Sequence, residues 1–336
     1  MKIFSIASCL AAAALLLLVN TGAPTGELAS AAAAKRPKPT YEVQIERNVM
    51  VRMRDGVSLA TDIYYPMRAG QRVDDKLPAV LQRTPYNKAG VEDVATFFAR
   101  HGYLSVVQDC RGRFESEGDF FPFVNEPKDG YDTIAWLAKH PACNGKVGMC
   151  GCSYLGWVQL QAATQRPPGL VTIIPFEGPN NGYHSSMHVG GALQLGLLHW
   201  IVGMAASSKE ARKDPALAKA AQSMHGPQNF LRWAARIPWQ RGQTPLSALP
   251  HYEDAAFKLW FENTEYNAFW RQAGLEWTST SIPLPTCRSS GWAAGMTGIR
   301  AASATGIKRW SSANARISTC WWGPGCTTSS TPPAAM

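Results

Sequence analysis

Residues 148–157, GMCGCSYLGW, place a serine between two glycine-containing turns, directly after the apolar run KVGMC at 146–150. Gly151 precedes Ser153 by two residues and Gly156 follows it by three. A serine on a sharp strand-to-helix turn with small neighbours is the arrangement of a nucleophile elbow. The spacing is G-x-S-x-x-G rather than the strict G-x-S-x-G, so the pattern alone leaves a packing turn as the alternative.

Apolar runs alternate with helical patterns around this turn. Buried parallel strands are predicted for 77–83, 103–109, 146–150 and 170–178. Helical spacing is found in 91–102, 126–141 and 156–165. Residues 41–65 alternate around the turn RDG and predict antiparallel strands. This order indicates an α/β fold whose mostly parallel sheet is covered on both faces.

The character of the chain changes after this α/β core, which is assigned to residues 41–177. Residues 178–276 are rich in Ala, Leu, Met and Trp with helical periodicity, which predicts a helical cap. Residues 277–287 are expected to return toward the core. Residues 288–336 contain no Asp, Glu, Leu, Val, Phe, Tyr, His or Gln, so we expect an aberrant, disordered tail.

The N-terminus has the layout of a secretory signal peptide, assigned to residues 1–34. Lys2 precedes an apolar segment at 11–19 and a small-residue stretch, and the apolar segment is short for a bilayer span. A retained membrane anchor is the alternative. The sequence therefore predicts a secreted or periplasmic protein with no membrane contact beyond the signal.

The net charge of +9 lies mostly at the two ends of the chain. Residues 1–38 carry +3 and residues 288–336 carry +5, which leaves +1 for the body. A nearly neutral body lacks the electrostatic footprint of a nucleic-acid-binding protein.

The eight cysteines do not form a recognisable framework. Cys9 lies in the signal segment and three others lie at or after residue 287. The CGC at 150–152 lacks metal-ligand spacing, which argues against a thiol redox or metal protein using Cys150 and Cys152. Buried small thiols are expected here, and a disulfide between Cys143 and Cys150 stays open.

Several linked motifs resemble one family, the CocE/NonD hydrolases. They are VRMRDGVSLATDIYYP, LQRTPYNK, HGYLSVVQDCRGRFESEGDF and GYDTIAWLAKHPACNGKVGMCGCSYLG, spread between residues 50 and 182. The family consists of α/β-hydrolases that include cocaine esterase, α-amino acid ester hydrolases, glutaryl acylases and X-Pro dipeptidyl-peptidases. The resemblance implies an α/β-hydrolase fold with a helical cap, and no metal or organic cofactor.

The resemblance also implies site residues. Ser153 would be the nucleophile, and the backbone N–H of Tyr154 would be one oxyanion donor. Tyr86 would supply the second donor through its hydroxyl, and a buried aromatic residue is the alternative reading. Asp109 and Arg111 resemble a strand-end loop in which we expect them to form a structural pair.

A serine nucleophile needs a histidine base and a carboxylate, in the chain order Ser, Asp, His for this fold. The seven histidines lie at 101, 140, 184, 188, 199, 225 and 251, and none follows. The resemblance places the Asp in a segment like GGWYD and the His in one like VGPWxH, both after the cap. His184 and His188 are conceivable substitutes, although cap packing is the expected role.

The tail holds both segments in a displaced reading frame. In this frame each codon consists of the third base of one codon and the first two bases of the next. The codons for Met296 and Thr297 then encode Asp, and those for Cys326 and Thr327 encode either His or Tyr. In the same frame, residues 320–323 force Leu-Val-Gly. We therefore predict a frameshift near Thr286–Gly291 and a C-terminally truncated chain without the family's C-terminal β-sandwich domain.

Two function classes follow from the sequence. The first is a serine hydrolase that cleaves a small-molecule ester or amide, or a peptide, through an acyl-enzyme on Ser153. The alternative is a catalytically inactive truncated remnant that lacks the triad Asp and His and at most binds a ligand.

Overall fold

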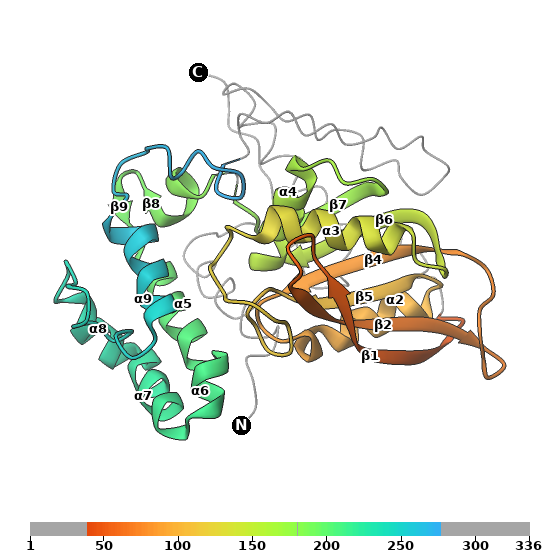
Figure 1. The fold of residues 1–336 in the computed structure, drawn as a ribbon, viewed down its shortest axis with the longest axis horizontal. Coiled ribbons are helices and arrows are strands. Elements are labelled where there is room, and N and C mark those ends of the chain that lie inside the picture. Colours follow the sequence, from red (N-terminus) through yellow and green to blue (C-terminus); the bar gives the residue numbers. More distant parts are fainter. Residues whose placement is uncertain (1–38, 180, 277–336) are drawn as a thin grey trace, which may run out of the picture. The chain divides into compact units, whose positions relative to one another are not determined.

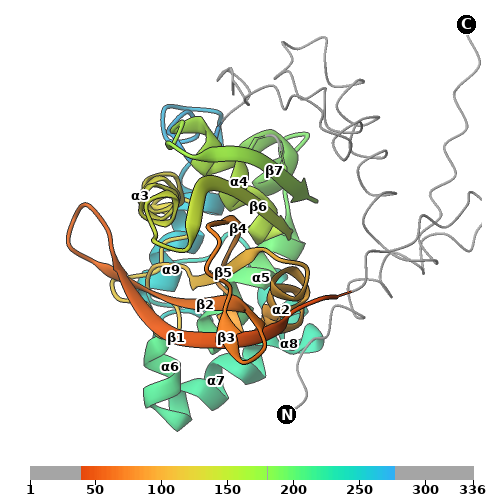
Figure 2. The ribbon, with the colours of Figure 1, turned by 90° about the vertical axis from the view of Figure 1, so that its right-hand side faces the viewer.

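The computed structural model describes residues 39–179 and 181–276 of the chain, and its centre is a mixed β-sheet. The sheet order is β1-β2-β5-β4-β6-β7, with the short β3 (Gln71–Arg72) paired to β2. Figure 2 shows the strands following one another in this order, with β1 at the bottom of the view and β7 at the top.

The first two strands form the predicted antiparallel pair. β1 (Glu42–Arg52) and β2 (Ser58–Arg68) pair through the turn that contains RDG, with a register shift between Glu46 and Val49. β2 is antiparallel to β5 (Leu104–Asp109). The remaining strands are parallel and comprise β4 (Leu77–Thr84), β5, β6 (Cys143–Cys152) and β7 (Leu170–Phe176).

Helices cover the sheet on both faces, as the sequence predicts. α2 (Glu92–Arg100) packs Ala95 and Ala99 against Tyr64 and Val107. The neighbouring strand residues Ile63 and Val106 belong to a larger cluster of buried side chains that includes residues of α3 (Glu126–Ala138) and α4 (Tyr154–Thr164). Because successive strand residues point to opposite faces, α2 lies on one face and α3 and α4 on the other.

From residue 178 to Glu276 the described chain is mostly helical. It contains the π-helical turns η2 (Tyr183–Met187) and η3 (Phe257–Phe261) and a 2-stranded pair, β8 (His188–Val189) with β9 (Ala192–Leu193). The α-helices are α5 (Leu195–Ala206), α6 (Lys209–Lys213), α7 (Pro215–His225), α8 (Pro227–Ala234) and α9 (Pro250–Ala256). Figure 1 shows α5–α9 gathered on one side of the sheet, and we call residues 178–276 the cap.

The cap shares one hydrophobic core with the sheet. A single cluster of buried side chains joins Leu81 and Val147 of the strands to Leu198 and Ile201 of α5 and to Trp260. Burial at roughly 25 cal/mol per Å² of apolar surface therefore stabilises core and cap together.

Parts of the sequence predictions fall outside the described residues. The signal peptide, the return segment at 277–287, the tail and the frameshift are all located there. Within residues 39–179 and 181–276, no helix is both long and apolar enough to cross a bilayer. The domain boundaries therefore stay predictions.

Candidate active site

Ser153 occupies a tight turn between β6 and α4. Its φ of 58° and ψ of −122° are strained values for a residue with a side chain, and Gly151 before it has a φ of 147°. The Ser153 side chain is exposed at the end of the strand, and its hydroxyl makes no capping hydrogen bond to the helix. This is the geometry of a nucleophile elbow.

The second glycine of the motif, Gly156, is required by a close contact. A Cβ on Gly156 would lie 2.7 Å from the carbonyl oxygen of Phe176, so only glycine lets α4 approach the end of β7 this closely. That same carbonyl accepts a hydrogen bond from the Ser153 backbone N–H at 2.9 Å. The Phe176 carbonyl at the end of β7 therefore contacts the turn at Ser153 and again at Gly156.

The Tyr154 backbone N–H is available beside the serine. Tyr154 is the first residue of α4, and N–H groups in the first helical turn have no intrahelical acceptor. The positive end of the helix dipole adds to the attraction for an anion at this point.

Tyr86 lies on the loop after β4, the strand next to β6, and reaches the same edge of the sheet. Its ring is 6.4 Å from that of Tyr154, and its hydroxyl oxygen accepts a hydrogen bond from Trp200 Nε1 at 3.1 Å. Desolvation raises the pKa of Tyr86 to about 12, opposed by hydrogen bonds with Trp200 and Ser153. The residue as a whole is 42% exposed, so this desolvation reflects the crowding around the hydroxyl, which stays protonated at neutral pH. The structure thus brings Ser153, Tyr154 and Tyr86 together.

Polar contacts fix the Tyr86 loop. The Tyr86 N–H donates to Thr84 Oγ1 at 3.1 Å, and the Pro85 carbonyl accepts from Arg113 Nε at 2.8 Å. The Lys88 N–H donates to Asp109 Oδ1 at 2.8 Å, and Lys88 Nζ lies 3.5 Å from Asp109 Oδ2. Tyr86 therefore sits on an anchored loop.

The expectation that Asp109 pairs with Arg111 is wrong. Asp109 is fully buried beside Lys88, and desolvation raises its pKa to about 6 although Lys88 opposes that rise. Arg111 instead forms ion pairs with Asp129 at 2.6 Å and Asp55 at 2.8 Å. The strand ends at Asp109, so the two side chains leave the chain in different directions.

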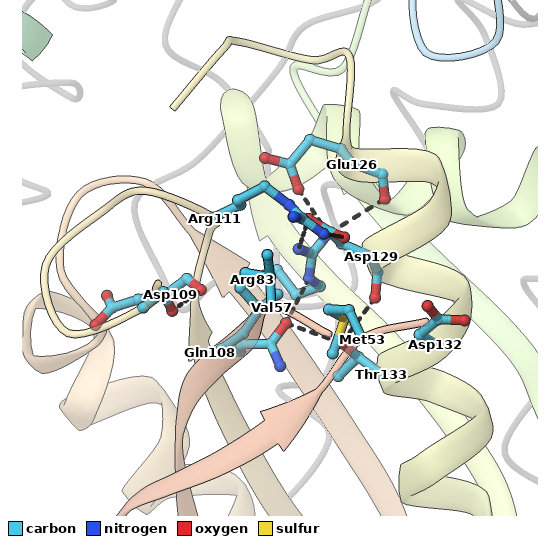
Figure 3. A network of polar contacts seen from close by, with 12 residues as sticks. Met53, Val57, Arg83, Gln108, Asp109, Arg111, Glu126, Asp129, Asp132 and Thr133 are labelled. Atoms are coloured by element: carbon cyan, nitrogen blue, oxygen red, sulfur yellow. Dashed lines mark hydrogen bonds and ion pairs between the residues drawn. The ribbon is translucent and has the colours of Figure 1, made fainter. Parts of the chain in front are cut away.

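A buried ionic network joins β4 to α3 (Figure 3). Arg83 of β4 is fully buried and pairs with Glu126 of α3 at 2.6 Å. Glu126 Oε1 also accepts the Tyr154 hydroxyl at 2.9 Å, and the Phe123 N–H donates to that hydroxyl at 3.0 Å. The side chain after the nucleophile is therefore tied to two other elements, which the sequence patterns did not reveal.

The cysteines near the serine are free thiols. Cys143 and Cys150 lie seven residues apart on the same strand, and at about 3.3 Å per residue they are far too distant for a disulfide. Burial raises the pKa of Cys150 to about 12, so it is not a reactive thiolate. The Cys152 thiol donates to Glu177 Oε2 at 3.2 Å.

The cap histidines considered as substitute bases make other contacts. His188 is buried, with Nε2 3.2 Å from the Leu259 carbonyl oxygen, and its ring stacks on Tyr183 at 4.7 Å. Burial lowers its pKa. His184 is exposed and packs against Tyr183 and Tyr266. These contacts favour cap packing over a role as the base.

A hollow of about 520 Å³ lies elsewhere on the molecule. It is lined by residues of β1 and α2 and by the segment just before β1, and these include Tyr41, Ile45 and Arg100. Because β1 is at the far end of the sheet order from β6, this hollow is separate from Ser153. The candidate site therefore consists of Ser153 on the elbow and the two predicted oxyanion donors, Tyr154 and Tyr86.

Comparison with known proteins shows which family the chain matches. The family model of the X-Pro dipeptidyl-peptidases (S15 family) matches residues 55–306. Cocaine esterase from Rhodococcus sp. (strain MB1 Bresler) is 40% identical over 184 residues, which cover 51% of this chain and 31% of that protein. The chain thus spans about a third of the length of this curated relative.

Two solved structures are also similar. An aminopeptidase from a marine sediment Thaumarchaeota archaeon has a TM-score of 0.50 at 23% identity, covering 79% of this chain and 44% of that one. A CocE/NonD family hydrolase from Staphylococcus aureus has a TM-score of 0.49 at 23% identity, covering 72% of this chain and 40% of that one. The first supports the α/β-hydrolase fold. Together with the family match over most of the sequence, the elbow places this chain in the X-Pro dipeptidyl-peptidase family S15, among the CocE/NonD-type α/β-hydrolases.

Proposed function

We propose that this chain is a serine acyl hydrolase that cleaves an ester, amide or peptide bond through an acyl-enzyme on Ser153. The observation that carries the proposal is the strained, exposed Ser153 at the start of α4, next to two candidate oxyanion donors. The relationship to cocaine esterase and to the X-Pro dipeptidyl-peptidases supports an ester or peptide substrate.

In the proposed reaction Ser153 Oγ attacks the substrate carbonyl carbon, and its proton passes to a base. The tetrahedral oxyanion accepts hydrogen bonds from the Tyr154 N–H and the Tyr86 hydroxyl. Collapse expels an alcohol or amine that takes up the proton, and water then hydrolyses the acyl-enzyme. Because Tyr86 keeps its proton at neutral pH, it enters this reaction as a donor.

The base and its carboxylate are proposed to be encoded in the displaced reading frame of the tail. The frame reads Asp at Met296–Thr297 and permits His at Cys326–Thr327. Sequencing the gene tests this idea, which fails if its codons do not spell Asp and His in that frame. As written, the chain keeps the nucleophile and the oxyanion donors, and the loss of triad partners is expected to cost several orders of magnitude in rate.

The alternative function is that of an inactive remnant that binds a ligand under the cap. The observation that favours it is the set of packing contacts made by His184 and His188, which leaves neither positioned as an evident base.

Fluorophosphonate labelling of the full chain separates the two functions. The hydrolase predicts covalent labelling that is lost in Ser153→Ala and kept in Ser247→Ala, which removes an exposed cap serine. Folded protein that resists labelling would instead identify the remnant.

We also propose that the protein is exported and acts on its substrate outside the cytoplasm, without nucleic acid or a cofactor. The signal-like segment at residues 1–34 motivates this proposal. N-terminal sequencing of the protein from its own host would show a start near Ala34, whereas a start at Met1 would contradict export through this segment.

A further inference from the structure

The oxyanion donor Tyr86 is contacted by the cap as well as by the core. Trp200 lies on α5 of the cap and is half-buried, and its indole Nε1 donates to the Tyr86 hydroxyl oxygen at 3.1 Å. The Trp200 ring also stacks on that of Tyr154 at 5.9 Å. One cap side chain therefore touches both candidate oxyanion residues.

A hydroxyl has one proton to donate and two lone pairs to accept with. When the Trp200 N–H occupies a lone pair of the Tyr86 oxygen, the O–H proton is directed away from the indole. The indole of Trp200 and the side chain of Ser153 therefore both lie against the Tyr86 hydroxyl. A hydrogen bond received by a donor also polarises its O–H bond and strengthens the bond it gives.

Arg113 makes a second link between the Tyr86 loop and the cap. It is 1% exposed and lies in the loop after β5. Its Nε donates to the carbonyl of Pro85, the residue before Tyr86, at 2.8 Å. Its Nη1 donates to the Met204 carbonyl of α5 at 2.9 Å.

The same guanidinium holds two more cap groups. Nη1 donates to the Tyr252 hydroxyl and Nη2 to Ser207 Oγ, each at 2.6 Å. Met204 is one helical turn after Trp200 on α5. Arg113 therefore fixes the position of this part of α5 relative to the Tyr86 loop. A cation at the C-terminal end of α5 is also favoured by the helix dipole.

We propose that Trp200 is a positioning residue for the oxyanion hole. Arg113 then sets the distance between Trp200 on α5 and Tyr86 on its loop. On this account the hole is assembled only when the cap is docked on the core. The inference rests on the proposed function, because it assigns Tyr86 the role of oxyanion donor.

Two measurements on the full chain test this assignment with Trp200→Phe, which keeps the aromatic ring and removes the N–H. The first is the second-order rate constant for fluorophosphonate labelling of Ser153. Losing a whole oxyanion donor costs ~10²–10³-fold, and we expect the loss of its supporting bond to slow labelling about 10-fold. The second is the pKa of a difluorotyrosine placed at position 86, which should rise when the Trp200 hydrogen bond is removed.

The matched control is Trp239→Phe. Trp239 is a buried cap residue whose Nε1 donates to the Trp233 carbonyl oxygen at 3.0 Å, so the same side-chain change removes an indole hydrogen bond elsewhere. Arg113→Lys keeps the charge but removes the forked geometry, and it should shift both measurements in the direction of Trp200→Phe.

The outcomes are distinct. Slower labelling and a higher pKa in Trp200→Phe, with neither in Trp239→Phe, support the proposal. Equal effects of the two substitutions, or no effect of Trp200→Phe, overturn it. If even the unmodified chain resists labelling, the proposed function fails, and the difluorotyrosine pKa then decides alone whether Trp200 positions Tyr86.

Discussion

The carboxylate of Glu126 in α3 accepts a hydrogen bond from the hydroxyl of Tyr154 at 2.9 Å, while its other oxygen pairs with Arg83 at 2.6 Å. The side chain of Tyr154, the residue after the nucleophile, is therefore hydrogen-bonded to a buried ion pair. The backbone N–H of Tyr154 is the proposed oxyanion donor, so this side-chain anchor fixes the donor's direction.

Glu126→Gln tests the anchor. The change removes the nearer carboxylate from the fully buried Arg83, whose Nη2 keeps Asp129 at 3.9 Å, and breaking a buried ion pair typically costs about 3–5 kcal/mol of unfolding free energy. Tyr154→Phe removes only the hydroxyl, and we expect about 1–3 kcal/mol because Glu126 keeps Arg83. Urea denaturation of both variants measures the two costs. Equal stabilities for the two variants would contradict a central role for the ion pair.

Gly156→Ala tests the close contact between α4 and β7. Glycine to alanine inside a helix normally adds stability, by about 1 kcal/mol. Here the new Cβ would lie 2.7 Å from the Phe176 carbonyl oxygen, so we expect a net loss of about 1–3 kcal/mol and slower labelling of Ser153. Gly90→Ala is the control, because a Cβ there meets nothing within 4 Å. A Gly156→Ala protein as stable as the control would refute the contact.

Asp109→Asn tests the buried carboxylate behind the Tyr86 loop. Desolvation raises the pKa of Asp109 from 3.8 to about 6, so between these values the folded state binds more protons than the unfolded state. The free energy of unfolding should therefore fall as pH rises through this window, relative to the Asn variant, by at most about 3 kcal/mol at 1.36 kcal/mol per pKa unit. Denaturation of both proteins at pH 4, 5 and 6 gives the difference. A difference that stays constant with pH would show that folding leaves the pKa of Asp109 unchanged. A difference that grows in favour of the native residue as pH rises would show that folding stabilises its charged form.

Restoring the displaced frame from Thr286 onward tests the missing triad. A gene so repaired should encode Asp and His at the positions read from Met296–Thr297 and Cys326–Thr327, and ester hydrolysis should increase by about 10³-fold or more. Replacing the restored His with Ala should remove that gain. No gain from the repaired gene would argue that the tail is not a shifted family sequence.

The strands and helices of the α/β core could be predicted from local pattern. The compact apolar runs became β4, β5, β6 and β7, and the helical patterns between them became α2, α3 and α4. The position of Ser153 followed from small residues at fixed spacing. Because β4 and β6 are parallel neighbours, the loop carrying Tyr86 then reaches the same edge of the sheet.

The polar partners could not be predicted in the same way. Arg113 and Tyr252 are 139 residues apart, and nothing near either residue in the sequence identifies the other. The Asp109–Arg111 pair was expected from the resemblance of this segment to the family's strand-end loop, yet each side chain has its partner on another element. The β8–β9 pair was also not predicted, because it is short and lies within a region whose apolar residues have helical spacing.

Peptide mapping of the full chain, after brief exposure to a p-nitrophenyl ester and acid quenching, shows directly whether Ser153 forms an acyl-enzyme. We predict one acyl group on the peptide that contains Ser153, absent from Ser153→Ala. Acylation confined to lysine side chains of the folded protein, with Ser153 unmodified, would contradict it.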